Sequence, residues 1–205
     1  HILDVVHKVM EERNIRFILT GSGARKLKRS GADLLGGRAL YYRMHPFTAG
    51  ELGKDFSIDK ALQTGLIPVV ERSMDPAGTL SAYIDIYLRE EIQAEGLVRN
   101  LGTFSRFLEI ISFSHGSVLN VSNIARECQA GRGLVTGFID ILEDLLLSYR
   151  LPVFTKRAKR KTSSHPKFYL FDNGLYRRLR QRGPLDTETE ISGPALEGLV
   201  GQHLR

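Results

Sequence analysis

The chain has 205 residues, a formal net charge of +6 at neutral pH and one cysteine, Cys128. A single cysteine excludes an internal disulfide and fits a reducing compartment. The sequence has no apolar run near the roughly 20 residues that a membrane-spanning helix needs. We therefore expect a globular cytoplasmic protein that does not enter a membrane.

The charge is unevenly distributed along the chain. Residues 150–182 contain eleven Lys and Arg residues and one Asp, a local net charge of +10 that leaves −4 for the rest. A basic segment on an acidic body predicts a polyanionic partner such as nucleic acid. The alternative is a solvated basic loop that only keeps the protein soluble.

The first 47 residues have the pattern of an α/β unit. Apolar residues at helical spacing predict a helix over 1–14, and the uninterrupted apolar run 17–19 predicts a strand covered on both faces. A helix and a second strand over 39–44 follow, as in a parallel sheet. Ligands bind at the carboxyl ends of such strands, where Thr20 and Ser22 fall. Ser22 has a second interpretation, as the N-cap of the helix that follows it.

A change of pattern marks the end of this unit. Thr48 and Glu51 have the spacing of a capping box, and Phe47 and Leu52 have that of a hydrophobic staple, so a helix is expected to begin at Thr48. Further helix caps are expected at Ser57, Gly65 and Asp75. Helical stripes after these caps predict a small helical lid over residues 48–96.

The next part, residues 97–182, predicts three helices and a hairpin. Thr103 and Asn120 are expected to cap the first two helices, and the third follows the turn at 129–133 with apolar 3,4 spacing as far as Tyr149. Extended runs at 151–155 and 167–171 then flank a basic loop, and Asp172 caps a helix over 173–181. Helix, short helix, tight turn, long helix and hairpin is the order of a winged helix-turn-helix.

This arrangement predicts a nucleic-acid interface. The wing carries five cations, and Arg132 and Thr136 begin the helix that would enter a major groove, with Lys167 at the base of the hairpin. The wing cations are Lys156, Arg157, Lys159, Arg160 and Lys161. Few polar side chains suited to base reading accompany them, so mostly non-specific DNA binding is expected. Gly183-Pro184 and the acidic stretch 186–190 then predict a linker before a helix that begins at Gly193.

Several of these segments together resemble a known family. They are Phe17-Ile-Leu-Thr-Gly-Ser-Gly-Ala-Arg-Lys-Leu27, Leu35-Gly-Gly-Arg38, Pro46-Phe47, Glu51-Leu52, Asn120-Val-Ser-Asn-Ile-Ala125 and Pro166-Lys-Phe-Tyr-Leu-Phe-Asp-Asn-Gly-Leu175. The chain resembles prokaryotic AAA-type P-loop ATPases that carry a C-terminal domain of unknown function. The resemblance implies a mixed, mainly α chain: the C-terminal half of an α/β P-loop ATPase core over 1–47, the lid, the winged helix, and over 183–205 the linker and first helix of a restriction-endonuclease-like module.

The resemblance also implies roles for particular residues. Thr20 or Ser22 would position the water that attacks the γ-phosphate. Arg38 would reach the phosphates of a neighbouring subunit as an arginine finger, which implies a homo-oligomer, and Arg25 is the second candidate for that contact. Local pairing of Arg38 with a carboxylate is the alternative. ATP and Mg²⁺ would be the cofactors of the parent protein.

Other features of the sequence limit these expectations. The chain has no Gly-x-x-x-x-Gly-Lys-Ser/Thr phosphate loop, so alone it is expected to be an inactive fragment that neither binds nor hydrolyses ATP. The six histidines are scattered, which predicts no metal site. Two other hypotheses stay open: a stand-alone winged-helix DNA-binding protein, and an interaction module whose winged helix packs against another part of the protein.

Overall fold

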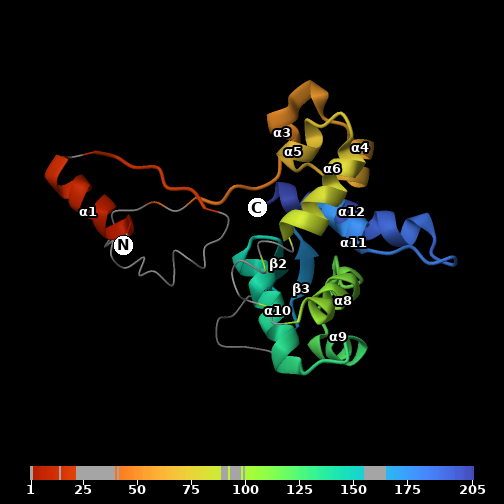
Figure 1. Ribbon diagram of the computed structural model, residues 1–205. Coiled ribbons are helices and arrows are strands. Elements are labelled where there is room, and N and C mark those ends of the chain that lie inside the picture. Colours follow the sequence, from red (N-terminus) through yellow and green to blue (C-terminus); the bar gives the residue numbers. More distant parts are fainter. Residues whose placement is uncertain are drawn as a thin grey trace.

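The computed structural model describes residues 2–13, 15–21, 40, 42–88, 92, 98, 100–154 and 165–205. Figure 1 shows a body of packed helices around a small sheet, with the first helix, α1 (Ile2–Arg13), lying apart from that body. The prediction of a mainly helical chain with a small β component is confirmed, as is the helix at the N-terminus. No helix in the described part is both long and apolar enough to cross a bilayer.

The two strands predicted before residue 47 are wrong for the residues that are described. Residues 15–21 and 42–47 have no regular secondary structure. The side chain of Ile18 is 93% exposed and that of Met44 is 89% exposed, where a covered strand was predicted. An apolar run forms a strand only beside other strands, and the described chain places none next to these segments.

Residues 49–88 form the predicted series of short helices. They are α3 (Ala49–Leu52), the 3₁₀ turn η2 (Gly53–Asp55), α4 (Ile58–Thr64), α5 (Pro68–Glu71), α6 (Pro76–Ala82) and the π-helix η3 (Tyr83–Leu88). Local chemistry determines where these helices begin and end. Thr48 and Glu51 form the predicted capping box, Ser57 and Asp75 cap α4 and α6, and Gly65 ends α4 with a φ of 76°.

The next six elements are the three strands of the sheet and the three helices that accompany them. They are α8 (Leu101–Ser112), β1 (Ser117–Val118), α9 (Val121–Glu127), α10 (Arg132–Asp144), β2 (Ser148–Leu151) and β3 (Lys167–Leu170). The strands are antiparallel in the order β1-β3-β2, with Ser117 opposite Phe168 and Tyr149 opposite Tyr169. Aromatic rings of α8 and α10 meet beneath them, since Phe138 lies 5.0 Å from Phe104, centroid to centroid.

The predicted limits of three of these elements need correction. Asn100, not Thr103, caps α8, because its side chain accepts the Thr103 N–H. The long third helix ends at Asp144 instead of continuing to Tyr149, since Leu146 adopts a left-handed conformation with a φ of 61°. That turn sends the chain directly into β2, so the first hairpin strand lies three residues before the predicted run at 151–155. Apolar spacing continues through this reversal, which is why periodicity alone missed it.

Two helices complete the body, α11 (Asn173–Leu179) and α12 (Glu188–His203). Asp172 caps α11 as predicted, although the helix ends before Gln181. The predicted start of the last helix at Gly193 is wrong, and the predicted linker is shorter than expected, since only residues 183–187 of it lie outside a helix. Thr187 and Glu190 form a capping box that begins α12 five residues earlier, and Pro194 lies inside the helix.

The last helices connect the other parts of the body. In Figure 1, α11 and α12 lie between the short helices α3–α6 and the group formed by α8, α10 and the sheet. One cluster of buried apolar side chains extends from Ile67 to Ala195, and a second joins Leu199 to Ala61 and Leu66. The hydrophobic core therefore includes residues on both sides of the domain boundaries predicted at 96/97 and 182/183. These domain boundaries remain predictions.

Candidate nucleic-acid interface

The exposed start of α10 brings two predicted site residues together. Arg132 is the first residue of the helix, and the Thr136 hydroxyl donates a hydrogen bond to its carbonyl oxygen at 3.0 Å. Both side chains are exposed. Further along the same helix, Asp140 and Glu143 hold Arg150 of β2 at 3.0 Å and 2.8 Å. The cationic end of α10 is therefore its first turn, and its second half is acidic.

Lys167, the third described residue of the predicted interface, has a carboxylate partner. It is the first residue of β3, and its Nζ lies 2.7 Å from Oε1 of Glu197 in α12. The Tyr169 hydroxyl donates to the same oxygen. The hydrogen bonds from Lys167 and then Tyr169 hold the pKa of Glu197 below its ordinary value. Glu197 is thus ionised at neutral pH and compensates the Lys167 charge.

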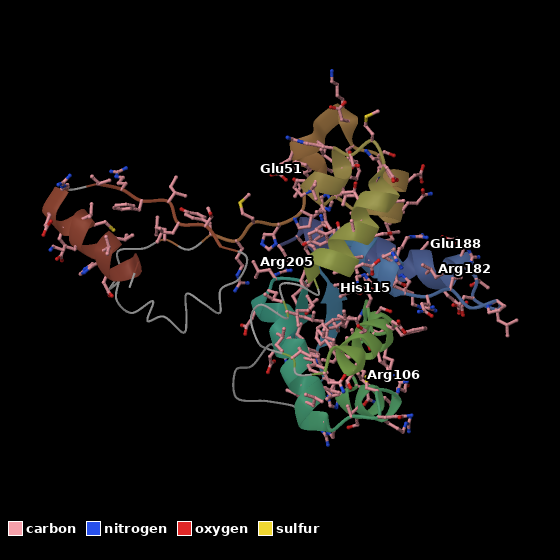
Figure 2. All side chains as sticks on the ribbon, viewed as in Figure 1. Glu51, Arg106, His115, Arg182, Glu188 and Arg205 are labelled. Carbon is pink, nitrogen blue, oxygen red and sulfur yellow. The ribbon has the colours of Figure 1, made fainter. Side chains whose placement is uncertain are left out.

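The same compensation extends to the other described cations of the basic segment. Each of the four arginines in 177–182 has a carboxylate partner within 3.3 Å, as Figure 2 illustrates for Arg182 and Glu188. The pairs are Arg177–Glu188, Arg178–Asp85, Arg180–Asp186 and Arg182–Glu188. Exposed pairs such as Arg178–Asp85 and Arg182–Glu188 add little to stability, but they reduce the net charge of the surface. The sequence count missed them because Asp85 and Arg178, for example, are far apart in the chain.

The remaining predicted site residues are placed as follows. Thr20 is exposed in an irregular segment, so its predicted position at the end of a strand is wrong. The other candidates for the ATPase chemistry, Ser22, Arg25 and Arg38, lie outside the described residues. The same holds for the five wing cations Lys156, Arg157, Lys159, Arg160 and Lys161. Within the described ranges, no group of three or more His, Cys, Asp or Glu side chains could hold a metal ion.

A buried histidine lies where α12 crosses the sheet. His115 Nδ1 accepts the Leu170 N–H at 3.0 Å, and its ring stacks on Tyr176 with 4.2 Å between centroids (Figure 2). Gly198 of α12 allows this contact, since a Cβ there would lie 2.3 Å from His115 Nε2. Burial lowers the pKa of His115 to about 4, against an opposing effect of the Pro194 carbonyl and the Glu197 carboxylate. The ring is therefore neutral at neutral pH. No sequence signal pointed to it.

The His115 pKa leads to a prediction about acid stability. Between pH 6.5 and 4 the unfolded histidine binds a proton and the folded one does not, so stability falls as the pH falls through this window. We expect wild type to lose about 3 kcal/mol relative to His115→Gln between pH 7 and 4. Urea unfolding of both proteins across this range measures the difference. Parallel pH profiles would contradict the neutral buried histidine.

A second buried group acts in the opposite direction in this window. Burial raises the pKa of Asp172 to about 6, although the N–H groups of Leu66, Leu175 and Gly174 that it accepts favour its charged form. The folded carboxyl thus binds a proton that the unfolded one releases, and acidification below pH 6 adds stability. Asp172 is present in both proteins of the comparison above, so its contribution cancels in their difference.

The chain is similar to two described families. Residues 55–186 match the family described as domain of unknown function (DUF8612), and residues 1–53 match the family described as AAA domain. An uncharacterized protein of Haemophilus influenzae is 22% identical over 191 residues, which cover 84% of this chain and 48% of the relative. The chain thus spans about half the length of the curated relative it matches. No solved structure is significantly similar to it.

Proposed function

Because the chain belongs to the family described as domain of unknown function (DUF8612), here preceded by an AAA domain match, we propose that it is a fragment of an AAA-type ATPase. In this proposal residues 97–182 are a winged-helix module that contacts duplex DNA. The proposal has two parts, the ATPase assignment of the first segment and the nucleic-acid contact of the second.

The element order supports a winged helix. α8, β1, α9 and α10 are followed by the β2–β3 hairpin, and the sheet order β1-β3-β2 places the returning strand in the middle. The turn between α9 and α10 is tight, since Gln129 has a φ of 52° and the Ala130 N–H donates to the Ala125 carbonyl. These two helices would be the helix-turn-helix, and residues 152–166 would be the wing.

The single observation that supports DNA contact most strongly is the concentration of positive charge between β2 and β3. Five cations fall within residues 156–161, in a stretch of sequence with no Asp or Glu from 145 to 171. β2 pairs with β3, so residues 152–166 connect these two strands. Five cations in such a connection would suit the phosphate backbone.

The ATPase part of the proposal concerns residues 1–53. Thr20 or Ser22 would position the attacking water, and Arg38, or Arg25 in second place, would act on the phosphates of a neighbouring subunit in a homo-oligomer. The phosphate loop that holds ATP and Mg²⁺ would belong to the rest of the parent protein, since this chain contains none. The chain by itself should therefore bind no ATP.

The wing provides the test of the DNA contact. We expect Lys159→Ala, Arg160→Ala and Lys161→Ala together to weaken binding to duplex DNA of any sequence, because each lost phosphate contact removes one released counterion. The slope of log affinity against log salt should flatten by up to about 3 units. Fluorescence anisotropy with a labelled mixed-sequence duplex, measured from low to moderate salt, gives both values.

A matched control separates the wing from net charge. Arg13, Lys54 and Arg182 are exposed cations outside the wing, and changing all three to Ala removes the same charge. We expect this control to retain most of the salt slope. If the wing variant has the DNA affinity and salt slope of wild type and an unchanged circular dichroism spectrum, the second candidate function is favoured instead. That candidate is a winged helix that packs against other modules, as its ion pairs with α12 suggest.

A further inference from the structure

Helix α12 contacts both halves of the body. Towards the AAA match, the Gln202 side-chain amide donates to the Phe47 carbonyl at 3.0 Å, and His203 Nε2 accepts the Ala49 N–H at 2.8 Å. Towards the sheet, Glu197 pairs with Lys167 and Gly198 lies against His115. The helix therefore spans the junction between residues 47–49 and β3.

The contact between α12 and the sheet is polar and incompletely hydrogen-bonded. Small residues, Gly198 and Gly201, face the sheet, and a Cβ at Gly201 would lie 2.6 Å from the Tyr149 hydroxyl. Two buried polar atoms at or near this contact have no hydrogen-bond partner in the described structure: Tyr149 Oη and Asn173 Nδ2. Unsatisfied buried groups cost stability, so this contact is weaker than an apolar one of equal size.

The contact between α12 and the sheet pairs one cation of the hairpin, Lys167, with a carboxylate. Lys167 lies six residues after Lys161 in the sequence, and its side chain is 43% exposed, so a phosphate could reach it. Glu197, itself 46% exposed, already neutralises the ammonium group. Its second donor, Tyr169, lies on the same strand and fixes the carboxylate over the start of β3. One strand therefore provides both donors to the Glu197 oxygen.

We propose that α12 restrains nucleic-acid binding by the hairpin, because Glu197 occupies Lys167 and keeps it from the phosphate backbone. Removal of this carboxylate, or movement of α12 off the sheet, adds one cation to the phosphate-binding surface next to the wing. The inference rests on the proposed DNA contact and adds its regulation. α12 also forms hydrogen bonds with Phe47 and Ala49, near the end of the segment that matches the AAA domain family. A rearrangement of that segment would therefore move the same helix.

The test is the single change Glu197→Gln, which keeps the size of the side chain and removes its charge. One added phosphate contact steepens the salt slope by about 0.9 and tightens binding roughly five- to tenfold at 0.1 M salt. The probe is the same labelled mixed-sequence duplex. Glu190→Gln is the matched control, since it removes one charge from the same helix, and glutamine also serves in a capping box.

A second variant makes the result specific to Lys167. Adding Lys167→Gln to Glu197→Gln should return the affinity and slope to wild-type values, because the cation that the first change releases is then absent. Equal binding by Glu197→Gln and Glu190→Gln, in a wild type whose binding depends on the wing, would overturn this inference and leave the proposed function standing. If wild type and Glu197→Gln both fail to bind the duplex, the DNA contact and its restraint are both wrong.

Discussion

Replacing Asp172 by alanine should lower the free energy of unfolding by about 3 kcal/mol. The carboxylate is buried and accepts the N–H of Leu66 at 2.7 Å and that of Gly174 at 2.8 Å, with Leu175 at 3.3 Å. Alanine would remove the cap of α11, worth about 1 kcal/mol, and leave the buried Leu66 N–H unpaired, which costs about 1–3 kcal/mol. Urea unfolding at pH 7, followed by circular dichroism, measures the loss.

An exposed cap of the same type provides the control for Asp172. Asp75 caps α6 by accepting the Gly78 N–H at 3.0 Å, but it is exposed and joins no second element. Asp75→Ala should therefore cost only about 1 kcal/mol. Equal losses in the two variants would mean that the bond from Leu66 adds nothing and that Asp172 is an ordinary cap.

The second large effect is expected at Gly174, where α11 meets the end of α4. A Cβ at this position would lie 2.2 Å from the Thr64 carbonyl oxygen and 2.8 Å from its carbon, which is too close for any side chain. Both groups are backbone, so relief requires the helices to move apart. We expect Gly174→Ala to cost about 3 kcal/mol, measured as the shift of the urea midpoint at constant slope.

A glycine in open space tests whether the close approach is the cause. Gly137 lies inside α10, and a Cβ there would meet nothing within 4 Å. Alanine at this position should stabilise the protein by about 0.5–1 kcal/mol, because it restricts the unfolded chain and favours the helix. Loss of stability in Gly137→Ala comparable to that in Gly174→Ala would show that the close approach of α4 and α11 is not responsible.

Several predictions from the sequence succeeded because the interactions involved are local. Thr48, Ser57, Asp75, Asn120 and Asp172 each cap the helix that follows, and each bonds an N–H within three residues. The buried faces of α8 and α10 likewise follow from 3.6-residue periodicity. Such features depend on neighbouring residues in the chain, so the sequence was sufficient to predict the order of the helices and the hairpin.

Other features depend on residues that are distant in the sequence. The apolar run 17–19 has the composition of a strand, but strand formation requires neighbouring strands, and in the described chain its side chains are exposed. The end of α10 was also missed, because the reversal at Leu146 directs the following residues into β2 without changing the apolar spacing.

The sequence by itself determined the helix caps, the amphipathic helices and the concentration of cations at 156–161, since each arises from composition and short-range spacing. Only the tertiary structure decided which cations of the basic segment are compensated. Lys167 of β3 contacts Glu197 because α12 lies against the sheet. Arg178 of α11 contacts Asp85 because η3 lies beside α11. It also decided that Asp172 bonds Leu66 besides capping α11. Electrostatic and hydrogen-bond partners are chosen by distance in space, which local spacing along the chain does not specify.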